Sequence, residues 1–318
     1  MRIVVTGACG QLGQAVVKLL YDRGFDVQTV DRESPREVFR RIIEQGRADQ
    51  VTNKDQQPGK IHYRQADLAD LGQVYGCLAG ATAVIHLGAI PSPAAHPPEV
   101  VFRNNVVAQF NVFEAAATLG IRRVVSASSV SALGFPWQHR WSEPIFFPID
   151  ESHPLLSQDA YGLSKSVGEE IAAAYCRRGA GRAASLRFST IIGEDRYARY
   201  VEHVKRDVAA QANMLWSYVD LRDAARACVL ALDAPLEGHV PLFITSADTS
   251  SDVPTDELLQ RYFPHVPRRS PPTSAGDPTT ARWSLIDCTR ARDLLGYRPA
   301  YHWPEILAAQ TGQQEITV

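Results

Sequence analysis

The feature that most constrains the fold is a glycine-rich turn near the start of the chain. The sequence TGACGQLG follows a short apolar run at residues 2–6 and precedes an amphipathic stretch at residues 11–23. The apolar run is typical of a buried strand, and apolar side chains recur in the next stretch with the spacing of a helix. Gly7, Gly10 and Gly13 therefore lie in a strand–turn–helix unit, the context that favours a dinucleotide-binding loop.

Each glycine has a separate role in such a loop. The first permits a tight turn, the second lets the backbone approach a pyrophosphate, and the third lets the helix and strand pack closely. Asp31 ends the next strand-like run, 18 residues after Gly13. Its carboxylate can accept hydrogen bonds from a ribose 2′-hydroxyl and repels a 2′-phosphate. The sequence therefore predicts NAD, although the neighbouring Arg32 leaves NADP open.

Strand-like and helix-like segments alternate through the first two thirds of the chain. This alternation predicts an α/β fold with a Rossmann-type, doubly wound parallel sheet and a small C-terminal lobe. We expect an NAD-binding domain of residues 1–187 and 216–245, interleaved with a substrate-binding lobe of residues 188–215 and 246–318. Residues 32–60 are expected to form a surface helix and loop. The expected strands and helices occupy residues 2–6, 11–23, 26–31, 61–66, 71–78, 83–87, 98–119, 123–127 and 159–178.

Tyr161 and Lys165 lie four residues apart in the helix expected at residues 159–178. This spacing places the phenol and the ammonium on one face, one turn apart. A free phenol has a pKa of about 10, too high for a base at neutral pH. A nearby ammonium favours the phenolate and lowers that pKa, as a bound nicotinamide cation would. Tyr161 would then act as a general base or acid toward a hydroxyl or carbonyl group.

A serine-rich run, SASS at residues 126–129, follows an apolar strand-like segment. It lies at the strand end where open α/β sheets bind ligands. A hydroxyl there can hydrogen-bond the reacting oxygen and orient it toward the phenol. Such a run is also typical of a simple turn or cap. Together with the glycine loop and the Tyr161–Lys165 pair, it predicts a catalytic site.

These motifs resemble the extended short-chain dehydrogenase/reductases of the NAD-dependent epimerase/dehydratase group, which include sugar epimerases and uronate-type sugar dehydrogenases. The resemblance runs from residue 1 to about residue 308. It rests on several motifs in the same order: TGACGQLG, Asp31, Asp67-Leu68, HLGA at 86–89, NVVA at 105–108, SASS, YGLSK, LRFSTIIG and RARDLLGYRP.

The resemblance implies a catalytic set of Ser129, Tyr161 and Lys165, with Ser128 as the fallback for the hydroxyl. Lys165 would also bind the nicotinamide ribose. Asp67 would meet the adenine edge with Leu68, or it would cap the helix expected at residues 71–78. The other residues expected to contact NAD are Gly7, Cys9, Gly10, Gln11, Leu12, Gly13, Arg32, Leu87, Gly88, Ala89, Asn105, Ala127, Ser128, Tyr161, Phe188 and Ser189.

The substrate side departs from nucleotide-sugar members of the group. Those members carry an Arg-Asp-aromatic run whose arginine grips a pyrophosphate, and here the corresponding residues 216–218 read WSY. Arg196 and Arg199 are candidates to clamp a carboxylate or phosphate, or they are solvated helix charges. The residues expected to contact the substrate are Pro91, Ser129, Ser131, Thr190, Arg196 and Arg199.

The leading expectation is an NAD-dependent oxidoreductase in which Tyr161 removes a proton from a hydroxyl of a sugar or sugar-like substrate. The hydride from the same carbon would pass to NAD. The alternative is a sugar epimerase that oxidises its substrate transiently with tightly bound NAD. A third reading is a dinucleotide-binding sensor without catalysis, and the complete Ser–Tyr–Lys set argues against it.

Composition and charge argue against several partners. A net charge of −2 gives no electrostatic footprint for nucleic acid or an anionic membrane. No apolar run approaches the roughly 18 residues of a spanning helix. Five widely spaced cysteines fit no zinc pattern, so we expect no metal site and a cytoplasmic protein. The apolar residues between positions 98 and 119 exceed one buried helix face, which together with the resemblance predicts a homodimer.

Overall fold

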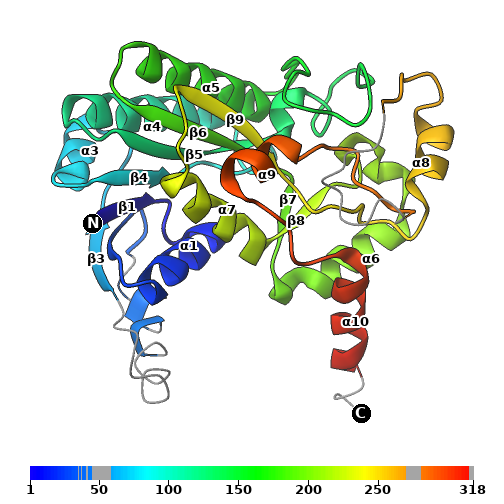
Figure 1. Ribbon diagram of the computed structural model, residues 1–318, viewed down its shortest axis with the longest axis horizontal. Coiled ribbons are helices and arrows are strands. Elements are labelled where there is room, and N and C mark those ends of the chain that lie inside the picture. Colours follow the sequence, from blue (N-terminus) through cyan, green and yellow to red (C-terminus); the bar gives the residue numbers. More distant parts are fainter. Residues whose placement is uncertain (35, 37, 41, 45–58, 270–280, 315–318) are drawn as a thin grey trace.

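The centre of the molecule is a seven-stranded parallel sheet in the order β3-β2-β1-β4-β5-β6-β9, with helices on both faces (Figure 1). The computed structural model describes residues 1–34, 36, 38–40, 42–44, 59–269 and 281–314. The strands of this sheet are β1 (Arg2–Thr6), β2 (Asp26–Asp31), β3 (Lys60–Gln65), β4 (Ala83–His86), β5 (Arg123–Ser129), β6 (Arg182–Phe188) and β9 (His239–Ile244).

The strand order shows where a ligand is expected to bind. β2 and β3 lie on one side of β1, and β4, β5 and β6 follow on its other side. In such a sheet the crevice outside the carboxyl ends of the strands, at the point where the order reverses, is the usual ligand site. β1 lies at this point, and its Ile3, Val4 and Val5 are fully buried, as in a strand covered on both faces.

Two layers of helices cover the sheet. α1 and α7 pack together on one face, and α3, α4 and α5 pack in a row on the other (Figure 1). Each face has its own apolar core, with Val16 and Ala224 in the first and Val112 and Tyr175 in the second. The bounds of these helices are α1 (Gln11–Asp22), α3 (Leu71–Leu78), α4 (Pro98–Thr118), α5 (Ala160–Arg177) and α7 (Leu221–Asp233).

A smaller group of elements follows β6. β7 (Thr190–Ile192) pairs in parallel with β8 (Tyr218–Asp220). α6 and α10 pack beside this pair around a separate apolar cluster that includes Tyr197 and Trp303. The other elements are α6 (Tyr197–Arg206), α8 (Thr255–Tyr262), α9 (Thr289–Leu295), α10 (Trp303–Gln314) and the 3₁₀ helices Val130–Leu133, Glu194–Arg196 and Ala209–Met214.

The predicted doubly wound sheet is confirmed. The strands expected at residues 2–6 and 26–31 have the same bounds in the structure, and β5 runs two residues further than expected, to Ser129. The bounds of α6 and the pairing of β7 with β8 were not predicted from the sequence. The surface helix and loop predicted for residues 32–60 fall largely outside the described residues. Within the part of the chain that the structure describes, no helix is long and apolar enough to cross a membrane.

Candidate active site

A cavity of about 850 Å³ lies at the carboxyl ends of the strands, a volume in the range of ligand and cofactor sites. It brings together segments that are far apart in the sequence. The residues singled out from the sequence that line it are Gly7, Cys9, Gly10, Gln11, Leu12, Gly13, Asp31, Arg32, Asp67, Leu68, Leu87, Gly88, Ala89, Pro91, Ala127, Ser128, Ser129, Ser131, Tyr161, Lys165, Phe188, Ser189, Thr190 and Arg196.

The glycine loop presents an open helix end to this cavity. Gly10 is the N-cap residue of α1, and no side chain caps this end. The first N–H groups of α1 are therefore available to an anionic ligand such as a pyrophosphate. A Cβ atom on Gly13 would lie 2.2 Å from the carbonyl oxygen of Gly7, so only glycine lets α1 begin so close to the loop.

Asp31 lies at the end of β2, on the rim of the same cavity. Its carboxylate accepts hydrogen bonds from the backbone N–H groups of Cys9, at 2.8 Å, and Glu33, at 3.2 Å. Glu33 also lines the cavity, although no sequence motif indicated it. Two carboxylates on one rim accept hydroxyl donors and repel a 2′-phosphate, so the residues present fit NAD.

The first turn of α5 fixes the position of Tyr161. The Asp159 carboxylate accepts hydrogen bonds from the backbone N–H groups of Tyr161, at 2.8 Å, and Gly162, at 2.9 Å. A Cβ atom on Gly162 would lie 2.5 Å from the Ser131 carbonyl oxygen, so this glycine lets α5 approach the turn after β5 closely. The phenol of Tyr161 and the Ser129 hydroxyl line the same cavity, and the Ser129 hydroxyl also accepts a hydrogen bond from the Ser131 N–H at 3.1 Å.

Burial controls the pKa values of the Tyr161–Lys165 pair. It raises the pKa of Tyr161 to about 12, against an opposing effect of the Ser129 hydrogen bond. It lowers the pKa of Lys165 to about 8, against the charge of Glu169. The Lys165 ammonium donates to the Ala127 carbonyl at 2.8 Å and lies 5.6 Å from the centroid of the phenol ring.

The expected net lowering of the Tyr161 pKa is therefore wrong for the chain without a bound ligand. Desolvation of the buried phenol is the largest contribution, and the remaining ones come from Ser129 and Asp159. Burial instead favours the neutral phenol of Tyr161 and the neutral amine of Lys165, because it removes both groups from water. A positive charge placed beside the phenol would act in the opposite direction.

Asn105 of α4 supports the loop that follows β4. Its amide accepts a hydrogen bond from the Ile90 N–H at 2.8 Å and donates to the Ile90 carbonyl and the Ser164 hydroxyl, each at 3.1 Å. It lines a small adjoining cavity and is not among the residues that line the large one, so its expected contact with the cofactor stays a prediction. His86 Nδ1 shares a hydrogen bond of 2.7 Å with the Thr6 hydroxyl. Burial lowers the pKa of His86 to about 3, so this ring is neutral.

Asp67 was expected either to meet the adenine edge or to cap the helix at residues 71–78. The N-cap of α3 is Asp70, whose side chain accepts from the Gln73 N–H. Asp67 instead accepts from the Ala69 N–H at 2.9 Å, in the turn before the helix, and lines the large cavity with Leu68. The capping alternative for Asp67 is wrong, because the helix begins three residues further on.

The two candidate arginines on the substrate side lie in different places. Arg196 ends a short 3₁₀ helix and lines the cavity, with 55% of its side chain exposed. Arg199 lies on the exposed face of α6 and is not among the cavity-lining residues. Tyr197 and Val201 of α6 are buried, and the helical spacing places Arg199 between them on the exposed face of the helix. The expectation that Arg199 contacts the substrate is therefore not met.

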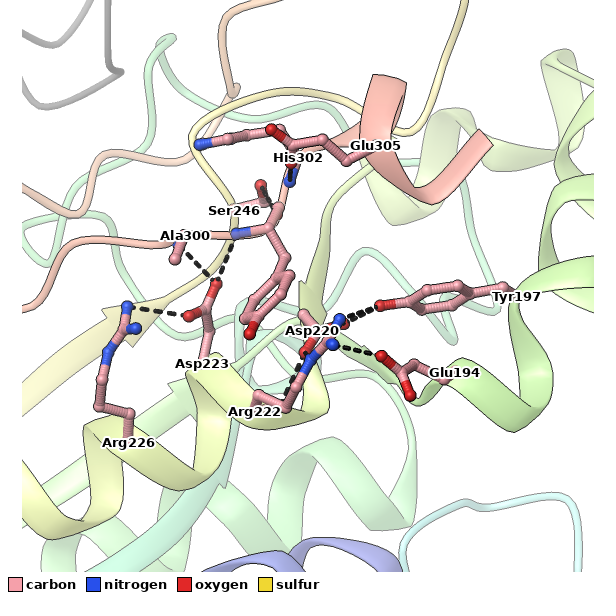
Figure 2. Close-up of polar contacts among 11 residues, drawn as sticks. Glu194, Tyr197, Asp220, Arg222, Asp223, Arg226, Ser246, Ala300, His302 and Glu305 are labelled. Carbon is pink, nitrogen blue, oxygen red and sulfur yellow. Dashed lines mark hydrogen bonds and ion pairs between the residues drawn. The ribbon is translucent and has the colours of Figure 1, made fainter. Parts of the chain in front are cut away.

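A polar cluster around Arg222 of α7 holds the segment that contains Arg196 (Figure 2). The Arg222 guanidinium donates to Asp220 at 2.8 Å and to the Tyr197 hydroxyl at 2.7 Å, and it pairs with Glu194. The ring of Tyr301 lies under it, at 3.5 Å from the centroid. The cluster thus joins α7, the start of α6 and the chain after α9, beside the cavity-lining residue Arg196.

Some residues that line the cavity were not singled out from the sequence, among them Asn104 and Met214. Asn104 directly precedes the Asn105 motif, so its place on the helix was a usable signal. Met214 precedes Leu215, which has a left-handed backbone with φ of 56°. No local pattern indicates that turn, and only the tertiary structure brings Met214 to the cavity.

Comparisons with known proteins agree with this geometry. The model of a family described as the NAD dependent epimerase/dehydratase family matches residues 3–242. A UDP-glucose 4-epimerase from Corynebacterium glutamicum is 24% identical over 95% of this chain and 92% of its own length. A uronate dehydrogenase from Pseudomonas syringae pv. tomato is 29% identical over 56% of each chain.

A solved structure has a similar fold. A short-chain dehydrogenase/reductase superfamily protein from Agrobacterium tumefaciens, with bound NAD, is 22% identical. It superposes with a TM-score of 0.69 over 99% of this chain and 98% of its own.

Proposed function

The chain belongs to the NAD-dependent epimerase/dehydratase family, and from that premise we propose that it oxidises a hydroxyl-bearing carbon of a sugar or sugar-like substrate with NAD. One observation carries the proposal. Ser129, Tyr161 and Lys165 line the same cavity as the glycine loop and Asp31. A reacting hydroxyl and a dinucleotide can therefore be held side by side by this chain's own residues.

Each member of the set has a separate task. As a phenolate, the form that a nearby positive charge favours, Tyr161 would take the proton from the substrate hydroxyl at its phenolic oxygen. Ser129, which lines the same cavity, would orient the reacting group. Lys165 supplies the nearby positive charge. The glycine loop and Asp31 hold the pyrophosphate and a ribose. When bound, NAD accepts or returns the hydride and adds a positive charge beside the phenol.

The substrate-side residues favour a substrate smaller than a nucleotide sugar. The pyrophosphate-gripping arginine of nucleotide-sugar enzymes is replaced by the WSY run at residues 216–218. Arg196, Pro91, Ser131 and Thr190 line the cavity. Arg196 would meet a carboxylate or phosphate, and the other three would form the walls. A sugar acid fits these features and agrees with the likeness to a uronate dehydrogenase. The alternative is an epimerase, which the likeness to a UDP-glucose 4-epimerase favours.

The retention of NAD separates the two alternatives. The freshly purified protein is denatured and the supernatant assayed for NAD and NADP. A dehydrogenase must exchange its cofactor in every turnover, so our proposal predicts a protein that is largely empty and binds added NAD reversibly. An epimerase recycles the hydride internally. One equivalent of NAD carried through purification would therefore replace the dehydrogenase by the epimerase.

Asp31 is expected to set the preference for NAD over NADP. The variant Asp31→Asn keeps an oxygen that can accept from the Cys9 N–H but loses the charge. We expect the Kd for NAD to rise about tenfold, since a hydrogen bond to a charged group contributes about 1.5–3 kcal/mol. The affinity for NADP relative to that for NAD should rise, and titration calorimetry measures both Kd values. The control Asp22→Asn removes the same charge at the far end of α1, where Asp22 pairs with Lys18. Equal effects in the two variants would refute the assignment.

We propose that the protein is a homodimer formed through α4 and α5. Phe110 of α4 is 50% exposed and Leu163 of α5 is 45% exposed, and these two helices pack against each other. Light scattering at micromolar concentration is expected to give twice the chain mass, and the double variant Phe110→Glu/Leu163→Glu to give the chain mass. A wild-type protein with the mass of one chain would contradict the dimer.

We also propose the division into an NAD-binding domain (residues 1–187 and 216–245) and a substrate-binding lobe (residues 188–215 and 246–318). The separate apolar cluster around β7, α6 and α10 supports it, although β8 pairs with β7 and so lies at the boundary. A cytoplasmic location is proposed from the five cysteines, which are all free thiols, as expected in a reducing compartment.

A further inference from the structure

A buried carboxylate lies directly behind the catalytic residues. Glu169 is on α5, four residues after Lys165, and is 6% exposed. Its Oε1 accepts a hydrogen bond of 2.6 Å from the Ser128 hydroxyl at the end of β5. The Arg187 guanidinium of β6 donates to both carboxylate oxygens, at 2.9 and 2.8 Å. One side chain thus joins α5, β5 and β6 beneath the cavity.

This ion pair lies directly behind the end of β5. Ser128 is adjacent to Ser129 in the chain, so the hydrogen bond to Glu169 fixes the end of the strand that carries the reacting hydroxyl. Glu169, Lys165 and His86 also line one small polar cavity of about 10 Å³. A buried ion pair adds little to stability compared with apolar residues of the same shape. Stability alone therefore does not explain why the Glu169–Arg187 pair lies at this place.

We propose that Glu169 is a positioning residue of the active site, whose carboxylate holds the Ser128–Ser129 strand end in place and provides a buried negative charge one helical turn after Lys165. The proposal rests on the proposed function, in which Lys165 acts as an ammonium. Glu169 does not contact the substrate and acts through its two neighbours.

The other groups that face Lys165 do not replace this charge. His86, at the end of β4, is neutral because burial lowers its pKa to about 3. Tyr161, on the same helix, is neutral because burial raises its pKa to about 12. Asn105 and Gln109 of α4 carry no charge. Arg187 of β6 is positive and is paired with Glu169.

The sign of the effect follows from these surroundings. Burial lowers the pKa of Lys165 to about 8, and the negative charge of Glu169 opposes that shift. Removing the charge should therefore lower the pKa further, and the ammonium would lose its proton nearer to neutral pH. A group that only supports the fold would leave this titration unchanged.

The experiment is a titration of Lys165 by NMR in protein labelled with ¹³C at the lysine ε-carbons. The chain has five lysines, at positions 18, 54, 60, 165 and 205, and the variant Lys165→Met assigns the signal. In Glu169→Gln we expect the midpoint of Lys165 to fall by about one pH unit. The matched control is Glu170→Gln, since Glu170 is the next residue on the helix and pairs with Arg177 at the surface. The control midpoint should equal the wild-type value.

A second variant keeps the test valid if Glu169→Gln fails to fold, because that change leaves Arg187 buried without its partner. Glu169→Gln/Arg187→Met removes both charges, a replacement that folded proteins commonly tolerate. The midpoint of Lys165 should again fall. An unchanged midpoint in the folded variants would overturn the proposal. Since the titration needs no substrate, a lowered midpoint together with no turnover of any sugar would retain this inference and refute the proposed function instead.

Discussion

Replacing Tyr161 by phenylalanine is expected to lower kcat by about three orders of magnitude, within the usual range for loss of a general acid or base. The phenol is the group that takes the proton in the proposed reaction. The change removes only its oxygen, so the ring should keep its packing in the first turn of α5. The affinity for NAD should change little, because the glycine loop and Asp31 lie on other elements. Turnover is measured with a panel of glucuronate, galacturonate, UDP-glucose and UDP-galactose, and NAD affinity by calorimetry.

A matched substitution separates the loss of chemistry from a general effect of removing a phenol. Tyr75 of α3 lies outside the cavity lining and shares a hydrogen bond of 3.0 Å with the Thr118 hydroxyl. Tyr75→Phe should keep kcat at the wild-type value. Full activity of Tyr161→Phe on a substrate that the wild type turns over would show that another group is the base.

Gly13→Ala is expected to have the second largest effect, on both stability and NAD affinity. The added Cβ would lie 2.2 Å from the Gly7 carbonyl oxygen and 2.7 Å from the Ala8 Cα atom. All of these are backbone atoms, so the loop itself must move. We expect a loss of about 3 kcal/mol in the free energy of unfolding and a rise of at least about tenfold in the Kd for NAD, equivalent to about 1.4 kcal/mol.

The chain offers a glycine for which the opposite result is expected. Gly76 lies inside α3, and a Cβ placed there has no neighbour within 4 Å. Gly76→Ala should therefore raise stability by about 0.5–1 kcal/mol, because alanine favours the helix. Chemical denaturation and NAD titration of both variants measure the effects. If Gly13→Ala bound NAD as tightly as the wild type, the loop would not be the cofactor site.

Local patterns predicted the part of the molecule that we propose holds NAD. β1 contains the apolar run IVV, and β2 (DVQTVD) is rich in β-branched residues. The glycine loop and Asp31 have fixed sequence spacing, so their arrangement follows from short segments. The i, i+4 spacing of Tyr161 and Lys165 likewise sufficed to place both side chains at one site. The cavity lined by all of these residues agrees with that reading.

The substrate side was harder to predict, because its contacts join distant segments. α6 carries a usable signal, since Tyr197, Val201 and Val204 follow the helical spacing and are buried, but charged residues between them obscured it. The same period explains why Arg199 faces away from the cavity. The Glu169–Arg187 pair joins a helix to a strand, and only the packing of α5 on the sheet brings the two together. The pKa of Tyr161 was misjudged for the same reason, because burial cannot be read from spacing.

The most direct test of the central claim is a turnover assay of the purified protein with added NAD and each member of the panel. The absorbance of NADH reports net oxidation, and NMR of the same mixtures reports any change in sugar configuration. Our account predicts NADH formation with at least one sugar acid, and none with Tyr161→Phe. A protein that binds NAD but forms neither NADH nor an epimerised sugar with any of these substrates would contradict it.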